Sequence, residues 1–148
     1  MTLQELADRI AIEQVRYRVA QALDQRDWPL LLQQFAPEVA VDFTSFGGPA
    51  QTVPREALVD NFRHNLSQPG LVTQHLCTNF RIELRGAAAT CVSQWVGHHF
   101  LAGLPSGEEF TLRAEYTDQL IQTPAGWLIA ATTARRLFTT GNAQLLKQ

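Results

Sequence analysis

The second half of this sequence contains four long strand-like stretches, at roughly residues 71–84, 88–102, 108–122 and 127–138. Turn signals rich in glycine and proline separate them, at residues 85–86, 105–107 and 124–126. Connections this short join antiparallel neighbours, because parallel strands need a crossover of about a dozen residues or more. The second half of the chain therefore predicts a series of hairpins in an antiparallel sheet.

Helix signals dominate the first half of the chain. A capping box at residues 2–5 predicts a long first helix that ends near Asp24. Asp27 can cap a second, shorter helix that runs through residues 30–35 and stops at Pro37. Two consecutive helices are therefore expected before the first strand.

One strand and a third helix complete the first half. Residues 38–45 alternate between polar and apolar side chains, as a strand does. Thr52, placed before Pro54, begins a helix that Pro69-Gly70 ends. Helices followed by a run of antiparallel strands are typical of an α+β fold. We expect residues 1–148 to form one domain, in which a curved antiparallel sheet packs on three helices and encloses an internal pocket.

Size and charge exclude several classes of protein. The chain has 148 residues and a net charge of −2, and its arginines are scattered, so it offers no electrostatic footprint for nucleic acid. Its apolar runs are too short to span a membrane, and its first residues do not resemble a signal peptide. Cys77 and Cys91 lie in apolar stretches, as buried reduced thiols do. We therefore expect a cytoplasmic protein that contacts neither nucleic acid nor membrane.

Two polar residues share a face of the first predicted helix. Tyr17 and Asp24 are seven residues apart, nearly two turns, and both are in line with Ile10. Asp24 thus falls with the apolar stripe, away from the polar edge that includes Arg16, and a carboxylate placed there needs a partner. Capping of a helix end is the alternative role for this aspartate.

The histidines supply further candidates. His75 lies at the start of a predicted strand where the alternation is poor, which indicates that a polar group points inward. His98 and His99 are consecutive in the next strand, so only one of them can enter the pocket. His64, on the third predicted helix, is expected at the surface.

Several kinds of site lack their sequence signals. The histidines and cysteines do not have the spacing of a metal site, so no metal is expected. Neither a GxSxG turn nor a glycine-rich phosphate loop occurs, which argues against a serine hydrolase and a nucleotide site.

Short segments spread over most of the chain resemble scytalone dehydratase and its SnoaL-like relatives, a branch of the NTF2-like cone fold. They lie at residues 23–28, 35–37, 41–46, 73–75 (Thr-Gln-His), 116–118 and 126–127. The resemblance implies a cofactor-free pair formed by Asp24 on the first helix and His75 on the sheet. The same pair resembles that of hexachlorocyclohexane dehydrochlorinase, in which β-elimination also needs a base and a leaving group.

The resemblance also implies a second catalytic histidine on the next strand. His98 is the nearer match, and a shift of one residue would select His99. Two tyrosines of the fungal enzyme correspond to Leu23 and Phe43, so their hydroxyls are missing here. Tyr17 and Tyr116 are the candidates to replace them.

These residues predict a cofactor-independent lyase, a dehydratase that removes water from a small cyclic or aromatic hydroxy-carbonyl compound, with His75 as base and Asp24 as its orienting partner. A small apolar or aromatic molecule would bind against large apolar side chains, which equally suit a core: Phe43, Phe46, Phe62, Leu76, Trp95 and Leu112. A ligand-binding protein without activity is one alternative. An isomerase or epoxide hydrolase with Asp42 or Asp118 as its base is another. The resemblance further implies a homo-oligomer, a dimer or a trimer.

Overall fold

The computed structural model describes residues 1–146 and has three α-helices and six strands in that range. The first half of the chain contributes α1 (Leu3–Gln25), α2 (Trp28–Leu32), β1 (Phe35–Asp42), β2 (Ala50–Pro54) and α3 (Arg55–Asn65). The second half contributes β3 (Val72–Arg85), β4 (Ala88–Phe100), β5 (Glu109–Thr123) and β6 (Gly126–Gly141). Short 3-10 turns lie at Thr44–Phe46 and Ala143–Leu146.

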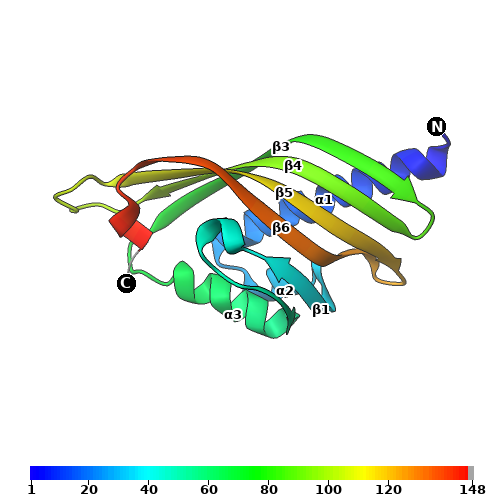
Figure 1. Cartoon of the computed structure of the whole chain (residues 1–148), viewed down its shortest axis with the longest axis horizontal. Helices are drawn as coiled ribbons and strands as arrows, with labels where there is room; N and C mark the ends of the chain where they lie inside the picture. Colours follow the sequence, from blue (N-terminus) through cyan, green and yellow to red (C-terminus); the bar gives the residue numbers. More distant parts are fainter. Residues whose placement is uncertain (147–148) are drawn as a thin grey trace.

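The four long strands of the second half form a curved layer, and the three helices lie on one side of it (Figure 1). The strand order is β2-β1-β6-β5-β4-β3, with antiparallel pairing along the predicted hairpins. The α+β fold class and its four hairpin strands are thus confirmed. One pairing departs from the all-antiparallel expectation, because β1 runs parallel to β6. Hairpin turns constrain only strands adjacent in sequence, and these two are far apart.

The segment after α1 differs from its prediction. The second helix ends at Leu32, and both Phe35 and Pro37 belong to β1. Pro37 lacks the N–H that a ladder requires, and it falls where the register between β1 and β6 shifts, between Phe35 and Ala40. A proline in this irregular part of the strand leaves the sheet intact, so it did not mark a boundary.

The strand β2 was absent from the sequence prediction, which began a helix at Thr52. Gly47 adopts a positive φ of 83° after the turn at Thr44–Phe46, and the chain then reverses. Residues 50–54 pair with β1, with Val41 opposite Gln51, and α3 begins only at Arg55. The Gly47 turn thus adds a hairpin between the first strand and the third helix.

The core lies between α1 and the sheet. The buried stripe of α1 comprises Ile12, Val15, Val19 and Leu23, whose spacing follows one face of a helix. Thr2 caps this helix and Glu5 reciprocates, as predicted. Among residues 1–146, none of the helices is both long and apolar enough to cross a bilayer.

Candidate active site

Asp24, near the end of α1, meets His75, near the start of β3. The carboxylate oxygen Oδ1 lies 2.6 Å from Nδ1 of the imidazole, and Oδ2 accepts a 2.9 Å hydrogen bond from the backbone N–H of His75. The His75 side chain is 7% exposed and that of Asp24 is 24% exposed. Two contacts between the same residues fix both the ring and the carboxylate, so the pair is rigidly oriented.

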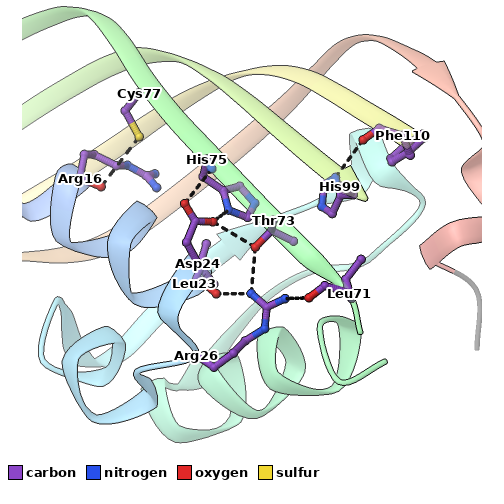
Figure 2. A network of polar contacts seen from close by, with 10 residues as sticks. All are labelled: Arg16, Leu23, Asp24, Arg26, Leu71, Thr73, His75, Cys77, His99 and Phe110. Carbon is purple, nitrogen blue, oxygen red and sulfur yellow. Dashed lines mark hydrogen bonds and ion pairs between the residues drawn. The ribbon is translucent and has the colours of Figure 1, made fainter. Parts of the chain in front are cut away.

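Further hydrogen bonds, made by Thr73 and Arg26, support the Asp24 carboxylate (Figure 2). The hydroxyl of Thr73 donates to Asp24 Oδ1 at 3.0 Å and accepts from Arg26 Nη1 at 2.8 Å. Arg26 also donates to the carbonyls of Leu23 and Leu71. Burial opposes ionisation of Asp24, but hydrogen bonds from His75 and Thr73 outweigh it and lower the pKa of the carboxyl. Asp24 is therefore an anion at neutral pH, and Arg26 and Thr73 are site residues that the sequence analysis missed.

The tautomer of His75 follows from this geometry. A carboxylate only accepts hydrogen bonds, so Nδ1 of His75 carries the hydrogen and Nε2 is left as an acceptor. His75 lines the main cavity, whereas Asp24 does not. Asp24 can thus act on a bound molecule only through the imidazole. The catalytic role of the two side chains stays a prediction.

His99, and not His98, enters the cavity. His99 is 6% exposed and stands edge to face with His75, with ring centroids 5.7 Å apart. Its Nδ1 lies 3.3 Å from the carbonyl oxygen of Phe110, which can only accept, so the hydrogen of the neutral ring is on Nδ1. His98 points to the exposed face and contacts Thr111. The preference for His98 as the histidine that faces the cavity was wrong, because the pairing of β3 with β4 places residue 99 on the same side of the sheet as His75.

Burial, and then the positive charge that His75 can carry, lower the pKa of His99 from 6.5 to about 4. Unfolded His99 binds a proton below pH 6.5, and the folded residue does so only below pH 4. The free energy of unfolding should therefore fall as pH decreases through this window, by roughly 3 kcal/mol from this residue. Urea unfolding at several pH values should show that His99→Asn flattens this dependence. The neighbouring His98→Asn variant is the control, and an equal flattening there would contradict the assignment to His99.

A cavity of about 480 Å³ opens between the sheet and α3. Five of the six apolar residues expected at a pocket line it: Phe43, Phe46, Phe62, Trp95 and Leu112. Leu76 does not, because it follows His75 in the strand and points to the opposite face, where it is 44% exposed. Leu23 and Phe43, the positions of the missing tyrosine hydroxyls, both lie in the cavity wall.

The two candidate tyrosines lie in different places. Tyr116 lines the cavity beside Trp95, and burial raises the pKa of its hydroxyl to about 12. Tyr17 is 41% exposed and packs against Phe80, outside the cavity. The seven-residue spacing placed Tyr17 with Asp24, but only the C-terminal end of α1 reaches the site. Tyr17 therefore does not join the pair.

A buried ion pair supports the cavity wall. Arg16 and Asp118 form a bidentate pair that is almost fully buried, and Arg16 also donates to Thr132. The Arg16 guanidinium lies 4.5 Å from the centroid of the Tyr116 ring and 5.6 Å from that of Trp95. The sequence analysis had assigned Arg16 to the solvated edge of its helix, which was wrong. The Arg16 guanidinium instead stabilises the Tyr116 and Trp95 rings of the cavity wall by cation–π contacts.

Two carboxylates considered as alternative bases do not line the cavity. Asp118 is engaged by Arg16, and Asp42 accepts hydrogen bonds from Thr44. In residues 1–146, histidine, cysteine and acidic side chains form no group of three or more that could hold a metal ion. The titratable groups that line the cavity among the described residues are therefore two imidazoles and one phenol, with the Asp24 carboxylate bound to one imidazole. The amides of Gln51, Asn61 and Asn65 line it as well.

Comparisons with known proteins place this arrangement in context. A curated relative, the uncharacterized protein Rv2910c of Mycobacterium tuberculosis, is 24% identical over 143 residues, which cover 93% of this chain and 91% of the relative. A Novosphingobium aromaticivorans protein provisionally named a scytalone dehydratase superposes with a TM-score of 0.82 at 19% identity, covering 96% and 92% of the two chains. Hexachlorocyclohexane dehydrochlorinase LinA-type3 of Novosphingobium barchaimii superposes with a TM-score of 0.75 at 20% identity, covering 95% and 94%.

These structural likenesses show a shared fold. The sequence match is more specific, since the family model described as the SnoaL-like domain matches residues 4–133, which include all the strands except the end of β6 and both members of the Asp24–His75 pair. The chain belongs to the SnoaL-like domain family.

Proposed function

We propose that the protein is a cofactor-independent lyase, a dehydratase in which His75 removes a proton from carbon and Asp24 orients and balances the charge of the imidazolium. The observation that carries the proposal is the 2.6 Å contact between Asp24 and Nδ1 of a histidine that lines the cavity. It makes Nε2 the free acceptor and stabilises the protonated ring that forms. The LinA-type3 and scytalone dehydratase names of the structural neighbours describe eliminations of the same kind.

Departure of the leaving oxygen needs a proton donor. Tyr116 lines the same cavity, and a phenol whose pKa is raised to about 12 keeps its proton at neutral pH. The single hydrogen of neutral His99 is engaged by a backbone carbonyl, since Phe110 and Gly97 both bond to this ring, so it is not available to the leaving group. Tyr116 is therefore the donor we assign to the leaving group. His75 takes the carbon-bound proton, the hydroxyl takes the Tyr116 proton and leaves as water, and a carbon–carbon double bond remains. Return of a proton from the His75 imidazolium to the Tyr116 phenolate restores both residues.

The lining of the cavity supports a neutral, largely apolar substrate. Among residues 1–146, no Arg, Lys, Asp or Glu lines the cavity. Burial of an unpaired charge would carry a large free-energy cost there. Phe43, Phe62 and Trp95 offer flat apolar surfaces that suit a ring. A small cyclic or aromatic hydroxy-carbonyl compound combines this shape with a proton acidic enough for an imidazole to remove.

A ligand-binding protein without activity is the second candidate. It is favoured by Leu23 and Phe43, which place hydrocarbon in the cavity wall where the fungal dehydratase has hydroxyls. Both candidates share the cavity and its apolar ligand. They differ in whether the bound molecule loses water.

One experiment separates the two candidates. Cyclic and aromatic hydroxy-ketones would be screened for binding through the tryptophan fluorescence, to which Trp95 in the cavity contributes, and for loss of water by mass spectrometry. A dehydratase should convert its ligand, and a substrate deuterated beside the carbonyl should lose its label. Tight binding of a compound that keeps both its hydroxyl and its deuterium would support the binding protein. Failure of the whole panel to bind would reject both proposals for this ligand class.

Filling the cavity should weaken binding without unfolding the protein. Leu112→Trp adds bulk to the wall, and overfilling a packed site costs about 1–3 kcal/mol, so affinity should fall by about tenfold or more. Ile121→Trp adds the same bulk at an exposed strand position outside the cavity and is the matched control. Ligand titrations of both variants would be compared after thermal unfolding has shown that the two are equally stable. Equal affinity of the two variants would show that the ligand binds elsewhere.

We also propose that the protein is cytoplasmic and that it assembles as a dimer or trimer through the outer face of its sheet. Val72 pairs with Phe100 across β3 and β4, and both are exposed there together with Leu76. Apolar side chains gathered on one face are typical of association surfaces. Sedimentation of the protein, with Phe100→Glu as the disruptive variant, measures the assembly. A monomer at all concentrations would reject it.

A further inference from the structure

Gly97 lies opposite His75 in the ladder between β3 and β4, and two residues before His99 on the same face. It is buried, and the rings of both histidines cover its open side. Its backbone does not explain the glycine, because its φ lies outside the left-handed region, unlike that of seven of the nine glycines. Glycine inside a strand usually weakens the strand and often marks a close approach of other groups. The close approach here involves two imidazoles.

The space beside Gly97 is already filled by the rings. A Cβ atom at this position would lie 3.1 Å from Cδ2 and 3.3 Å from Nε2 of His75, and 3.2 Å from Cε1 of His99. These distances are shorter than ordinary van der Waals contacts, so a methyl group would force one or both rings to move by a few tenths of an ångström. His75 has little freedom to give way, because Asp24 holds its other nitrogen at 2.6 Å. The methyl would also crowd the nitrogen that is left as acceptor.

We propose that Gly97 is a positioning residue of the site: by lacking a side chain it keeps Nε2 of His75 open and lets the His99 ring stand perpendicular beside it. The role in turnover rests on the proposed lyase function, whereas the placement of the rings does not. The 88° angle between the two imidazoles brings the edge of one ring to the face of the other, an arrangement that a third group between them would disrupt. Gly97 thus contributes to the reaction through the placement of two neighbouring imidazole rings.

Gly97→Ala tests this proposal by two readouts. Nuclear magnetic resonance of the imidazole nitrogens should show shifted His75 signals and an altered pH dependence, while the unfolding midpoint is retained because the extended backbone accepts alanine. A misplacement of about 1 Å can cost about 10²-fold in rate, so a shift of a few tenths of an ångström should lower kcat by about tenfold and change KM less. Unchanged imidazole signals and pH dependence would overturn the proposal.

Gly48→Ala is the matched control for the imidazole spectrum. Gly48 also has a φ outside the left-handed region, but its added Cβ would lie 3.4 Å from Phe43 and far from the histidines' contacts. The His75 signals should stay in place in this variant, and equal shifts in both variants would count against Gly97. If Gly97→Ala does not fold, Gly97→Ala/His99→Ala, which removes one of the two obstructing rings, should fold, and an unfolded double variant would overturn the steric argument.

The imidazole spectrum also separates the two proposals. Shifted signals in Gly97→Ala, together with the absence of turnover for every hydroxy-carbonyl compound, would support the positioning role and reject the lyase. Full turnover with an unshifted spectrum would reject the positioning role and keep the lyase.

Discussion

Replacement of His75 by alanine should lower kcat by about 10² to 10⁴, the usual contribution of a general base. Asp24→Asn should cost a similar factor, because the amide cannot balance the imidazolium and no longer selects the Nδ1–H tautomer. Steady-state kinetics on the best hydroxy-ketone of the screen would measure both variants. His98→Ala, which removes an exposed histidine from the neighbouring strand, is the control and should keep its turnover.

The double variant is the sharper part of this test. If His75 and Asp24 act as one unit, the variant that lacks both should be scarcely slower than either single variant. Independent roles would instead multiply the two losses. Binding of the substrate, followed by tryptophan fluorescence, should persist in all three, which separates lost chemistry from a lost cavity. A His75→Ala protein with nearly full turnover would end the proposed mechanism.

The largest loss of stability is expected from the buried ion pair of Arg16 and Asp118. Asp118→Asn keeps the shape of the side chain but leaves the guanidinium charge without its partner, and breaking a buried pair typically costs about 3–5 kcal/mol. Equilibrium unfolding in urea measures this change. The double variant Arg16→Met/Asp118→Leu removes both charges and should recover much of the loss, because no unpaired charge remains buried.

A surface pair that shares strand β5 with Asp118 provides the comparison. Arg135 contacts Glu115 at 3.0 Å across β5 and β6, and the Arg135 side chain is largely exposed. Exposed pairs contribute about 0–1 kcal/mol, so Arg135→Ala should change stability little. Equal effects of Asp118→Asn and Arg135→Ala would show that the Arg16 charge is reached by solvent. Loss of Arg16 should also loosen Tyr116 and Trp95, over whose rings it lies.

The hairpin strands and the helix caps follow from local signals, and this explains why they could be predicted. Turn residues and capping boxes act over a few positions, so a single sequence displays them in full. The parallel contact of β1 with β6 depends on two segments far apart, and β2 is only Ala50–Pro54, with little room for a pattern. The predicted helix boundaries at Pro37 and Pro54 were wrong, because proline is tolerated at a sheet irregularity and at a strand end as well as beside a helix.

The candidate site was predictable in part for the same reason. Alternation along a strand shows that His98 and His99 point to opposite faces, but which one faces inward depends on the pairing of β4 with β3. No local pattern distinguishes Arg16 from the other arginines of its helix, since its partner Asp118 lies on β5. The sequence did not indicate that Arg26 belongs to the site, because its side chain reaches Thr73 only through the left-handed turn that ends α1.

The parallel pairing of β1 with β6 has a consequence for how the chain folds. It places Ala40 beside Ala131, so forming this contact closes a loop that includes most of the chain, at a corresponding cost in conformational entropy. Contacts this distant in sequence slow folding, because the chain loses the entropy of loop closure before the contacts can stabilise it. The hairpins of β3 to β6, and that of β1 with β2, can form from neighbouring residues first, whereas the docking of β1 on the main sheet must wait for β6. During synthesis on the ribosome, the wall of the cavity that β1 and β2 supply is therefore assembled only after nearly the whole chain has emerged.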